Sequence, residues 1–483
     1  MNRRCLAAVR ACETDFGCCM FDLIVRGGTI VSSDGLTRAD IGIANGIIKA
    51  IVQAGETPAA ATEIDAKGKF ILPGLVDAHV HIPGYLLRHR LDDFSSATAA
   101  AAIGGVTTIM LMPTDDPRTV SASYFERKKR IGEQESFVDF AIQALVSPKT
   151  ECGEIEEMAS LGPVSFELFL AYGGNPAFVV AHDDYELHRL MKLVHDVGGV
   201  VGVTPHSGSL IAKLTELQKQ REAERQHLDP QRRGDPLPPV QNFAMTRPTL
   251  SEGLGITRAC TVACETGTRV HLRSLSSQKS IDLVRRFRDS LPLTSEVMSH
   301  HLLFAEEEAV ELGPYGIIIP PIRTSNERDC LRSAVRSGEI DMVVSDHSPV
   351  LREDKELGWS DVWRTPPGMP GLQTLCMSML ALVADDQLSM SDIARSCAER
   401  PSKAFGLFPK KGALQVGSDA DLIVINGTDR TLITDSQQRS KADYTTLKGR
   451  TINGRVEGVF LRGKMIARDG EVVSRPNGSF VRP

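Results

Sequence analysis

Short apolar runs alternate with amphipathic helical patterns along the middle of the chain, from residue 72 to residue 349. Runs of this length bounded by turn residues are typical of buried strands, and their alternation with helices indicates a parallel sheet. Eight such runs predict a (β/α)8 TIM barrel of the α/β class, whose chemistry lies at the carboxyl ends of the strands. The polar segment 211–247 predicts a helix and loop over the barrel mouth. The predicted strands are residues 72–82, 105–113, 139–146, 165–172, 199–206, 268–275, 293–302 and 341–349.

The two ends of the chain show another pattern, in which short alternating strands are separated by Gly, Asn and Asp turns. Because both ends are β-rich, we expect them to pair into one small β-sandwich domain beside the barrel. The predicted organisation is an N-terminal extension over 1–20, expected to be disordered, a first β segment over 21–71, the barrel over 72–410, a second β segment over 411–475 and a tail over 476–483.

Composition and charge exclude several classes of protein. The formal net charge of −6 and a pI near 6.1 give no electrostatic reason to expect a nucleic acid or membrane partner. No apolar run approaches the roughly 18–20 residues that span a bilayer. The ten cysteines are scattered without CxxC pairs, which is typical of reduced thiols in a cytoplasmic protein. The first twenty residues lack the apolar core of a signal peptide.

Ionisable residues fall at the carboxyl ends of several predicted strands. His79 and His81 are two residues apart, so a strand places both on one face, close to Asp77. Imidazoles and carboxylates that converge from separate strands suit Zn²⁺ most, and also Mn²⁺ or Fe²⁺. The other members of the predicted cluster are Glu167 in the fourth strand, His206 at the end of the fifth, His271 near the end of the sixth, and Asp346, followed by His347, at the end of the eighth.

Each of these signals has a simpler interpretation when it stands alone. An isolated HxH pair is more often structural than metal-binding, and the sequence "SDHSP" is compatible with a turn that Asp346 caps. His300 and His301 can line the barrel, the interpretation that we prefer for His301. The convergence of several polar groups at one barrel mouth favours a functional site over these alternatives.

Several segments resemble the cyclic amidohydrolases, the group of hydantoinases, dihydropyrimidinases, allantoinases and dihydroorotases. The resemblance runs in order from about residue 21 to 473, and its motifs are "PGLVDAHVHI", "GGVTTIMLMP", "VHLRS", "PPIRTSNERDCL", "DMVVSDHSP" and "PSKAFGLFPKKGALQVGSDADLIV". It implies a hydrolase that opens a cyclic amide, imide or ureide ring by attack of metal-bound hydroxide, in the form of a homodimer or homotetramer. It also implies that His79, His81 and Asp346 hold one metal, that Asp346 is the general base and acid, and that Tyr172 polarises the carbonyl.

The chain departs from the family pattern where a carboxylated lysine bridges two metals. The fourth strand reads "SFELFLAY", with Glu167 at the lysine position, and no lysine occurs between Lys149 and Lys192. On the fifth strand Thr204 stands where the family has a histidine, and His206 follows two residues later. The second metal site is therefore either rebuilt around Glu167 and His206, which we favour, or lost. The alternative for Glu167 is a buried ion pair with an arginine such as Arg273.

The sequence does not identify the substrate. The arginine that dihydroorotases carry just after the HxH pair is absent, because Ile82, Pro83 and Gly84 follow His81. The resemblance suggests substrate contacts at Ile319, through its backbone, and at Gly371. Arg273 is a further candidate, although we prefer a surface-facing position for it. Two other functions remain possible: a catalytically silent scaffold related to dihydropyrimidinase, and a hydrolase of an acyclic or exocyclic C–N bond.

Overall fold

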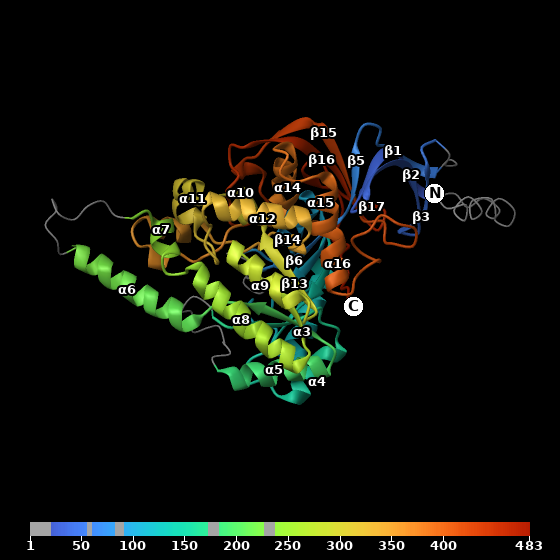
Figure 1. Ribbon diagram of the computed structural model, residues 1–483. Coiled ribbons are helices and arrows are strands. Elements are labelled where there is room, and N and C mark those ends of the chain that lie inside the picture. The colour runs from blue at the N-terminus through green and yellow to red at the C-terminus, as the bar shows by residue number, and fades with distance from the viewer. Residues whose placement is uncertain (1–20, 56–59, 83–90, 172–182, 227–236) are drawn as a thin grey trace.

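Parallel strands form a closed barrel in the centre of the molecule (Figure 1). The computed structural model describes residues 21–55, 60–82, 91–171, 183–226 and 237–483. Three strands pair in the order β6-β7-β8 and six in the order β9 to β14. The backbone N–H of His81, just after β6, donates to the carbonyl of His347, just after β14, over 2.9 Å and closes the ring. The barrel strands are β6 (Leu75–Val80), β7 (Val106–Leu111), β8 (Asp139–Ile142), β9 (Ala144–Leu145), β10 (Phe166–Phe169), β11 (Val200–Thr204), β12 (Arg269–Leu272), β13 (Leu293–Met298) and β14 (Met342–Val344).

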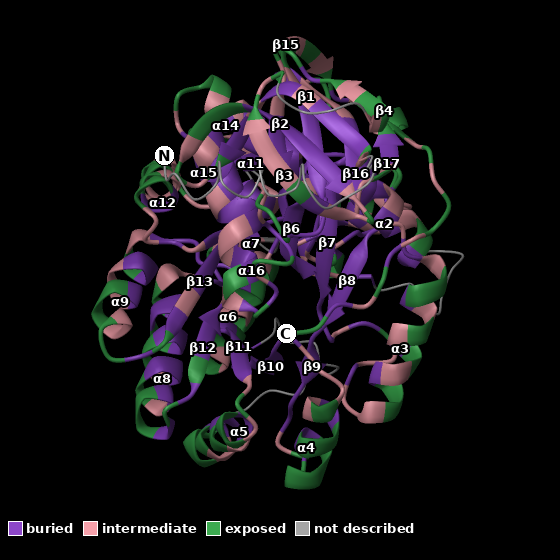
Figure 2. Cartoon of the chain, turned by 90° about the vertical axis from the view of Figure 1, so that its right-hand side faces the viewer, coloured by how far each residue is buried: buried purple, intermediate pink, exposed green. Residues whose placement is uncertain are grey.

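Helices connect successive strands and cover the outside of the barrel. Figure 2 shows that the strands are buried, whereas the helices carry their exposed residues on the outer faces. Helix α6, which lies in the segment predicted to be helical, extends outward from the body in Figure 1. The helices are α2 (Phe94–Ile103), α3 (Ala122–Glu135), α4 (Cys152–Ser160), α5 (Asp184–Asp196), α6 (Gly208–Gln226), α7 (Pro239–Ala244), α8 (Thr249–Thr266), α9 (Gln278–Arg288), α10 (Ser299–Leu303), α11 (Glu306–Leu312), α12 (Ser325–Ser337), α13 (Arg352–Glu356), α14 (Leu375–Ala384), α15 (Met390–Ala394) and α16 (Arg400–Ala404).

The two ends of the chain form one sheet of nine strands beside the barrel. Its order is β18-β17-β16-β15-β5-β1-β2-β3, with β4 paired to β1, so β15 joins the C-terminal half to the N-terminal strand β5. The predicted fold class, a TIM barrel with a small β domain from both termini, is confirmed. The strands are β1 (Phe21–Ser32), β2 (Gly35–Ala44), β3 (Ile47–Gln53), β4 (Ala60–Asp65), β5 (Phe70–Pro73), β15 (Leu422–Leu432), β16 (Thr451–Leu461), β17 (Lys464–Arg468) and β18 (Glu471–Val472).

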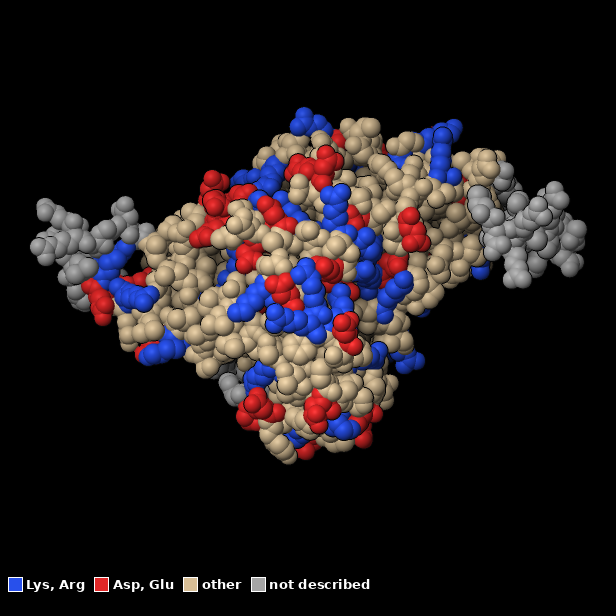
Figure 3. All heavy atoms as spheres, in the orientation of Figure 1, with Lys and Arg blue, Asp and Glu red and all other residues tan. Residues whose placement is uncertain are grey.

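Apolar burial explains why the runs seen in the sequence become strands. Every residue of β6 and of β7 is buried, as expected for parallel strands that face packed layers on both sides. The part of the chain that the structure describes contains no helix long and apolar enough to cross a membrane. Lys and Arg are interspersed with Asp and Glu over the face shown in Figure 3.

A buried lysine ties the β domain to the amino-terminal end of the barrel strands. The Nζ atom of Lys411 lies 2.5 Å from Asp139 at the start of β8, 2.8 Å from Asp419 and 2.7 Å from Asp421, and its side chain is fully buried. The C-terminal segment lies beside it, because the N–H of Val481 donates to the carbonyl of Phe140 over 2.8 Å. Three carboxylates around one ammonium form a structural cluster, with the lysine at the place where a cation would bind.

Substituting Lys411 with methionine is expected to cost about 3 kcal/mol of stability, because Asp419 and Asp421 lose their counter-ion and Asp139 keeps only Arg462. Burial lowers the pKa of Lys411, but the charges of Asp421, Asp139 and Asp419 raise it above its ordinary value. Because the folded-state pKa is raised, the charged lysine stabilises the fold fully at pH values below its unfolded pKa near 10.4, and this stabilisation is lost only at higher pH. The stability lost in Lys411→Met should therefore be constant from about pH 6 to 9. Thermal unfolding checks this. The exposed neighbour Lys410→Met is the control, and equal stability of the two variants would contradict the role of the cluster.

Candidate metal centre at the barrel mouth

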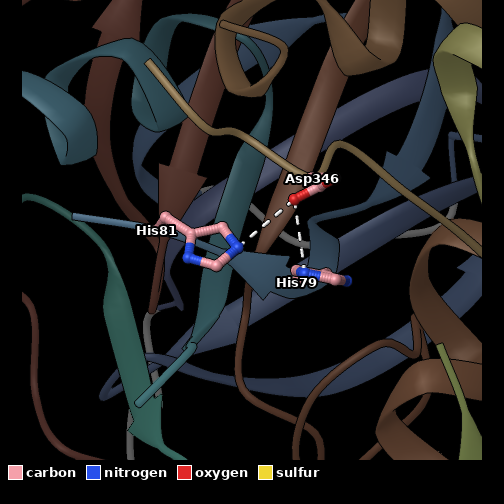
Figure 4. A group of neighbouring side chains, drawn as sticks. All are labelled: His79, His81 and Asp346. Carbon is pink, nitrogen blue, oxygen red and sulfur yellow. Dashed lines mark ion pairs between the residues drawn. The ribbon is translucent and has the colours of Figure 1, made fainter. Parts of the chain in front are cut away.

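Two histidines and an aspartate meet at the carboxyl ends of β6 and β14. His79 belongs to β6, His81 follows its last residue, and Asp346 lies two residues beyond β14. The Nε2 atoms of His79 and His81 lie 3.3 and 3.4 Å from the same Oδ1 of Asp346 (Figure 4). Their possible ligand atoms all lie within 4.8 Å of one another. The three residues predicted to hold one metal are therefore brought together.

Hydrogen bonds to the other ring nitrogens orient both imidazoles. His79 Nδ1 lies 2.5 Å from Glu296 Oε1, and His81 Nδ1 lies 2.9 Å from Thr114 Oγ1. A carboxylate only accepts hydrogen bonds, so the nitrogen of His79 that faces Glu296 carries the proton. Both Nε2 atoms consequently face Asp346. Two imidazole nitrogens and one carboxylate with this arrangement are a donor set that fits Zn²⁺ or another divalent transition metal.

The electrostatics of the cluster favour a cation. Burial lowers the pKa of His79, but Asp346 and Glu296 raise it to about 8. Burial raises the pKa of the Asp346 carboxyl, whereas the neighbouring His79 and His81 lower it below its ordinary value. For Glu296, burial raises the pKa, and the charge of Arg273 holds it well below the usual range. Two ionised carboxylates thus flank His79.

The backbone of Asp346 is also unusual. Its φ is +43°, in the left-handed region that residues other than glycine, asparagine and aspartate seldom adopt. Asp77 holds the two strand ends together below it, since its Oδ1 accepts from the N–H groups of His79 and Ser345, each over 3.2 Å. Burial raises the pKa of the Asp77 carboxyl to about 6. Asp77 therefore links the two strand ends that carry the metal-binding residues.

Glu167 lies in an ion pair with Arg273. Arg273 donates from Nη2 to Oε1 of Glu167 over 2.7 Å and from Nε to Oε2 over 3.1 Å, and Ser165 adds a third hydrogen bond of 2.7 Å. The carboxylate lies against Gly202 of β11, where a Cβ atom would come within 2.0 Å of it. Of the two hypotheses for Glu167, the structure realises the ion pair and does not bring this carboxylate to His79, His81 and Asp346.

Arg273 is completely buried, so the preferred surface-facing position was wrong. Besides Glu167, it donates to Gln143 Oε1 over 2.5 Å, to the carbonyl of Ala78 over 3.0 Å and to Glu296 Oε2 over 2.9 Å. The guanidinium thus satisfies acceptors from four different parts of the barrel wall. Two buried carboxylates and one buried guanidinium satisfy each other, which is the condition for tolerating charges in a protein interior.

His271 lies beside this ion pair with both ring nitrogens occupied. Its Nε2 lies 2.9 Å from Glu296 Oε2, its Nδ1 lies 2.9 Å from Thr294 Oγ1, and its side chain is fully buried. Burial and the nearby charge of Arg273 lower its pKa. His271 therefore packs against the carboxylate of Glu296 and is not among the residues gathered around Asp346.

His206 also lies apart from the His79, His81 and Asp346 cluster. It is buried, and its Nε2 has no hydrogen-bond partner among the described residues. Burial, and then the charges of Arg323 and Arg247, lower the pKa of its imidazole to about 3. Within the described ranges it does not belong to a group of three or more potential metal ligands. Among the described residues, Glu167 and His206 are therefore not gathered into a second group of ligands at the barrel mouth.

A small pocket opens above the metal cluster. Ile319, expected to contact the substrate, lines it together with Thr204. Gly371, the other predicted contact, donates its N–H to His347 Nδ1 over 3.3 Å. Tyr172 lies outside the described residues. The described residues that line the pocket are His79, His81, Met112, Phe169, Thr204, Ser274, Ile319, Asp346, Ser348, Pro367 and Gly368.

Two buried acids near the site were missed by the sequence analysis. Glu296 is buried in strand β13, but the sequence of this strand, LTSEVM, is half polar, so Glu296 does not stand out as Glu167 does. Asp92 accepts from His347 over 2.9 Å, from Ser440 over 2.7 Å and from the N–H of Lys441 over 2.6 Å. It thereby anchors the residue that follows Asp346. Asp92 directly precedes Asp93, whose side chain caps the N-terminus of α2.

A closed (β/α)8 barrel with a His-His-Asp cluster at its strand ends defines a class of barrel hydrolases, and comparison with known proteins specifies the family. The sequence model of the amidohydrolase family matches residues 70–466. The L-hydantoinase of Paenarthrobacter aurescens is 33% identical over 465 residues, covering 96% of this chain and 98% of that enzyme. The allantoinase of Rubrobacter xylanophilus is 32% identical over 475 residues, with 96% and 98% covered.

The solved structures agree. The L-hydantoinase (dihydropyrimidinase) from Arthrobacter aurescens matches with a TM-score of 0.90 at 32% identity, covering 96% of this chain and 100% of that one. A D-hydantoinase structure matches with a TM-score of 0.85 at 29% identity, with 95% and 98% covered. The chain belongs to the amidohydrolase family. The resemblance to the cyclic amidohydrolases seen in the sequence is confirmed.

Proposed function

We propose that this protein is a metal-dependent hydrolase that opens the ring of a cyclic amide, imide or ureide, as the names of its hydantoinase and allantoinase relatives suggest. The observation that carries the proposal is the cluster of His79, His81 and Asp346 at the barrel mouth, with both Nε2 atoms turned to one carboxylate oxygen. A silent scaffold has no physical need for three converging ligands with oriented imidazoles.

The mechanism assigns distinct tasks to these side chains. His79 and His81 would hold the cation through Nε2, and Asp346 would contribute its carboxylate. A divalent cation in this place supplies Lewis acidity, which lowers the pKa of a water ligand towards ~7 and polarises a carbonyl. Asp346 then accepts the proton of the attacking water and passes it to the ring nitrogen as the C–N bond breaks. Ser348 steadies this carboxylate, since its Oγ donates to Oδ1 over 3.2 Å.

We infer that one metal ion is held per chain. Two of the positions expected to hold a second ion are engaged otherwise, because Glu167 is paired with Arg273 and both ring nitrogens of His271 form hydrogen bonds. The third, His206, belongs to no group of three potential ligands among the described residues. A second dication beside the Arg273 guanidinium would also be repelled by a fixed positive charge. Elemental analysis of the purified protein should therefore find about one zinc, manganese or iron per chain, and two would contradict this stoichiometry.

The pocket favours a small, flat ring. Its apolar lining includes Met112, Phe169 and Ile319, and its polar side includes Ser274. Ser274 has a φ of +53°, in the left-handed region of the backbone. Backbone strain of this kind is found where a side chain is held for a function. We propose that Ser274 contacts a carbonyl or N–H group of the substrate.

Substituting Ser274 with alanine is expected to raise KM for the best ring substrate about tenfold, because one hydrogen bond of about 1–1.5 kcal/mol is lost. The metal content should not change, since Ser274 is not among the three potential metal ligands. Steady-state kinetics with elemental analysis of the same samples check this. A Ser274→Ala enzyme with an unchanged KM would remove Ser274 from the substrate contacts.

Assays on a panel of rings test the proposed function. Purified protein loaded with zinc, or with manganese, is incubated with hydantoins, dihydropyrimidines, allantoin and cyclic imides, and with acyclic amides for comparison. Ring opening of at least one cyclic compound, abolished by a chelator and restored by added metal, is the expected result. Bound metal with turnover of acyclic amides alone would favour a different C–N hydrolase. Absence of both metal and turnover would favour the scaffold.

A further inference from the structure

A buried acid, Glu296, contacts His79 but is not one of the three potential metal ligands. We infer that Glu296, held in place by Arg273, is the positioning residue that fixes the His79 imidazole so that its Nε2 is presented to the metal. The inference rests on the proposed metal site and extends it to the layer beneath. In this view the ion pairs of Arg273 with Glu167 and with Glu296 support the metal site from outside, and none of these three residues is a metal ligand.

The contacts of Glu296 divide between its two oxygens. Oε1 lies 2.5 Å from His79 Nδ1. Oε2 accepts from Arg273 Nη1 over 2.9 Å and lies 2.9 Å from His271 Nε2. Because a carboxylate offers only acceptors, it fixes the proton of His79 on Nδ1 and leaves the lone pair on Nε2. The side chain is fully buried, so water does not compete for either oxygen.

Arg273 determines where this carboxylate stands. Its other donors go to Glu167, to Gln143 and to the carbonyl of Ala78, the residue before His79. The same guanidinium therefore contacts the backbone of β6 and the acid that orients His79 on β6. Glu167 keeps Arg273 in this orientation with two hydrogen bonds, for which Gly202 provides the space.

The residue at position 296 must accept a hydrogen bond through each of its two terminal atoms. In Glu296→Gln, one oxygen becomes an NH₂ group. If that group faces Arg273, two donors oppose each other. If it faces His79, Nδ1 must accept, and the ring proton moves to Nε2, where it blocks the metal. Loss of a partner that orients a metal-bound histidine typically costs 10- to 100-fold in metal affinity. We expect a change of this size for Glu296→Gln.

Metal affinity, measured apart from activity, tests the inference. Metal-free protein is titrated with Zn²⁺ in competition with a chromophoric chelator, for the wild type, Glu296→Gln and Glu296→Asp. The aspartate keeps the charge beside Arg273, and hence the fold, but withdraws the carboxylate from His79 by about 1.5 Å, beyond hydrogen-bond distance. Both variants should bind Zn²⁺ at least tenfold more weakly.

Glu252→Gln is the matched control. Glu252 is a buried glutamate that also accepts several hydrogen bonds, from the N–H and hydroxyl of Ser276 and from Ser280, and it contacts none of the three metal-binding residues. Its Zn²⁺ affinity should stay at the wild-type value. Wild-type affinity in both Glu296 variants, or an equal loss in Glu252→Gln, would overturn the inference.

The same titration separates this inference from the proposed function. Zinc binding by the wild type, weakened as expected by the Glu296 variants, supports the positioning role even if no ring is opened, in which case only the proposed reaction falls. A wild-type chain that binds no divalent metal would overturn both.

Discussion

Replacing Asp346 with asparagine is expected to lower kcat/KM for ring opening by roughly 10³- to 10⁴-fold, because the amide can neither take the proton of the attacking water nor return it to the leaving nitrogen. Asparagine is the appropriate replacement, since it tolerates the left-handed backbone at this position, where φ is +43°. Rates should be measured at saturating metal, so that loss of a ligand is not mistaken for loss of proton transfer.

Asp443 provides the matched control for this substitution. It is exposed, and its φ of +62° is also in the left-handed region, so Asp443→Asn makes the same chemical change in the same backbone conformation away from the metal cluster. Wild-type kinetics are expected for it. Metal-saturated Asp346→Asn that retains more than a tenth of the wild-type rate would exclude Asp346 as the proton carrier.

Substitution of Glu167 with alanine should have its largest effect on stability. It leaves Arg273 with a single carboxylate in a fully buried position, and breaking a buried pair in this way typically costs 3–5 kcal/mol. The bound metal should remain at about one ion per chain, because Glu167 lies with Arg273 and not with the His79 cluster. Thermal unfolding and elemental analysis of the same preparation measure the two effects.

Two comparisons make the Glu167 result decisive. Glu167→Gln retains the shape and one acceptor, so it should lose less stability than alanine does. His81→Ala removes a metal-binding residue and should lose the metal. If Glu167→Ala loses its metal at saturating concentration as His81→Ala does, the carboxylate is a metal ligand and the ion-pair interpretation fails.

The sequence was sufficient to predict the barrel and its principal cluster. Buried parallel strands such as β6 and β7 appear as continuous apolar runs, and the two-residue strand period places His79 and His81 on one face. Asp346 could be added because the carboxyl ends of all barrel strands meet at one mouth. Periodicity and topology place these residues at one mouth, whereas the grouping of His79, His81 and Asp346 around one metal came from the resemblance to the cyclic amidohydrolases.

The partner of Glu167 could not be predicted in the same way. A buried carboxylate needs a cationic partner, which Glu167 has, but a metal ion and a guanidinium are both suitable partners. Glu167 and Arg273 lie on β10 and beyond β12, separated by β11, so their contact depends on the relative height of non-adjacent strands and on the absence of a side chain at Gly202. Register of that kind is a property of the assembled barrel.

The ion pair of Glu167 with Arg273 has a consequence for how the centre matures. The resemblance implies a carboxylated lysine at the position of Glu167, and formation of such a group consumes carbon dioxide. Here each buried charge is encoded in the chain itself. We expect metal-free protein to be fully reconstituted by one divalent metal in carbonate-free buffer, at a rate independent of added bicarbonate. The rate of maturation would then depend on the metal concentration and not on the carbon dioxide concentration.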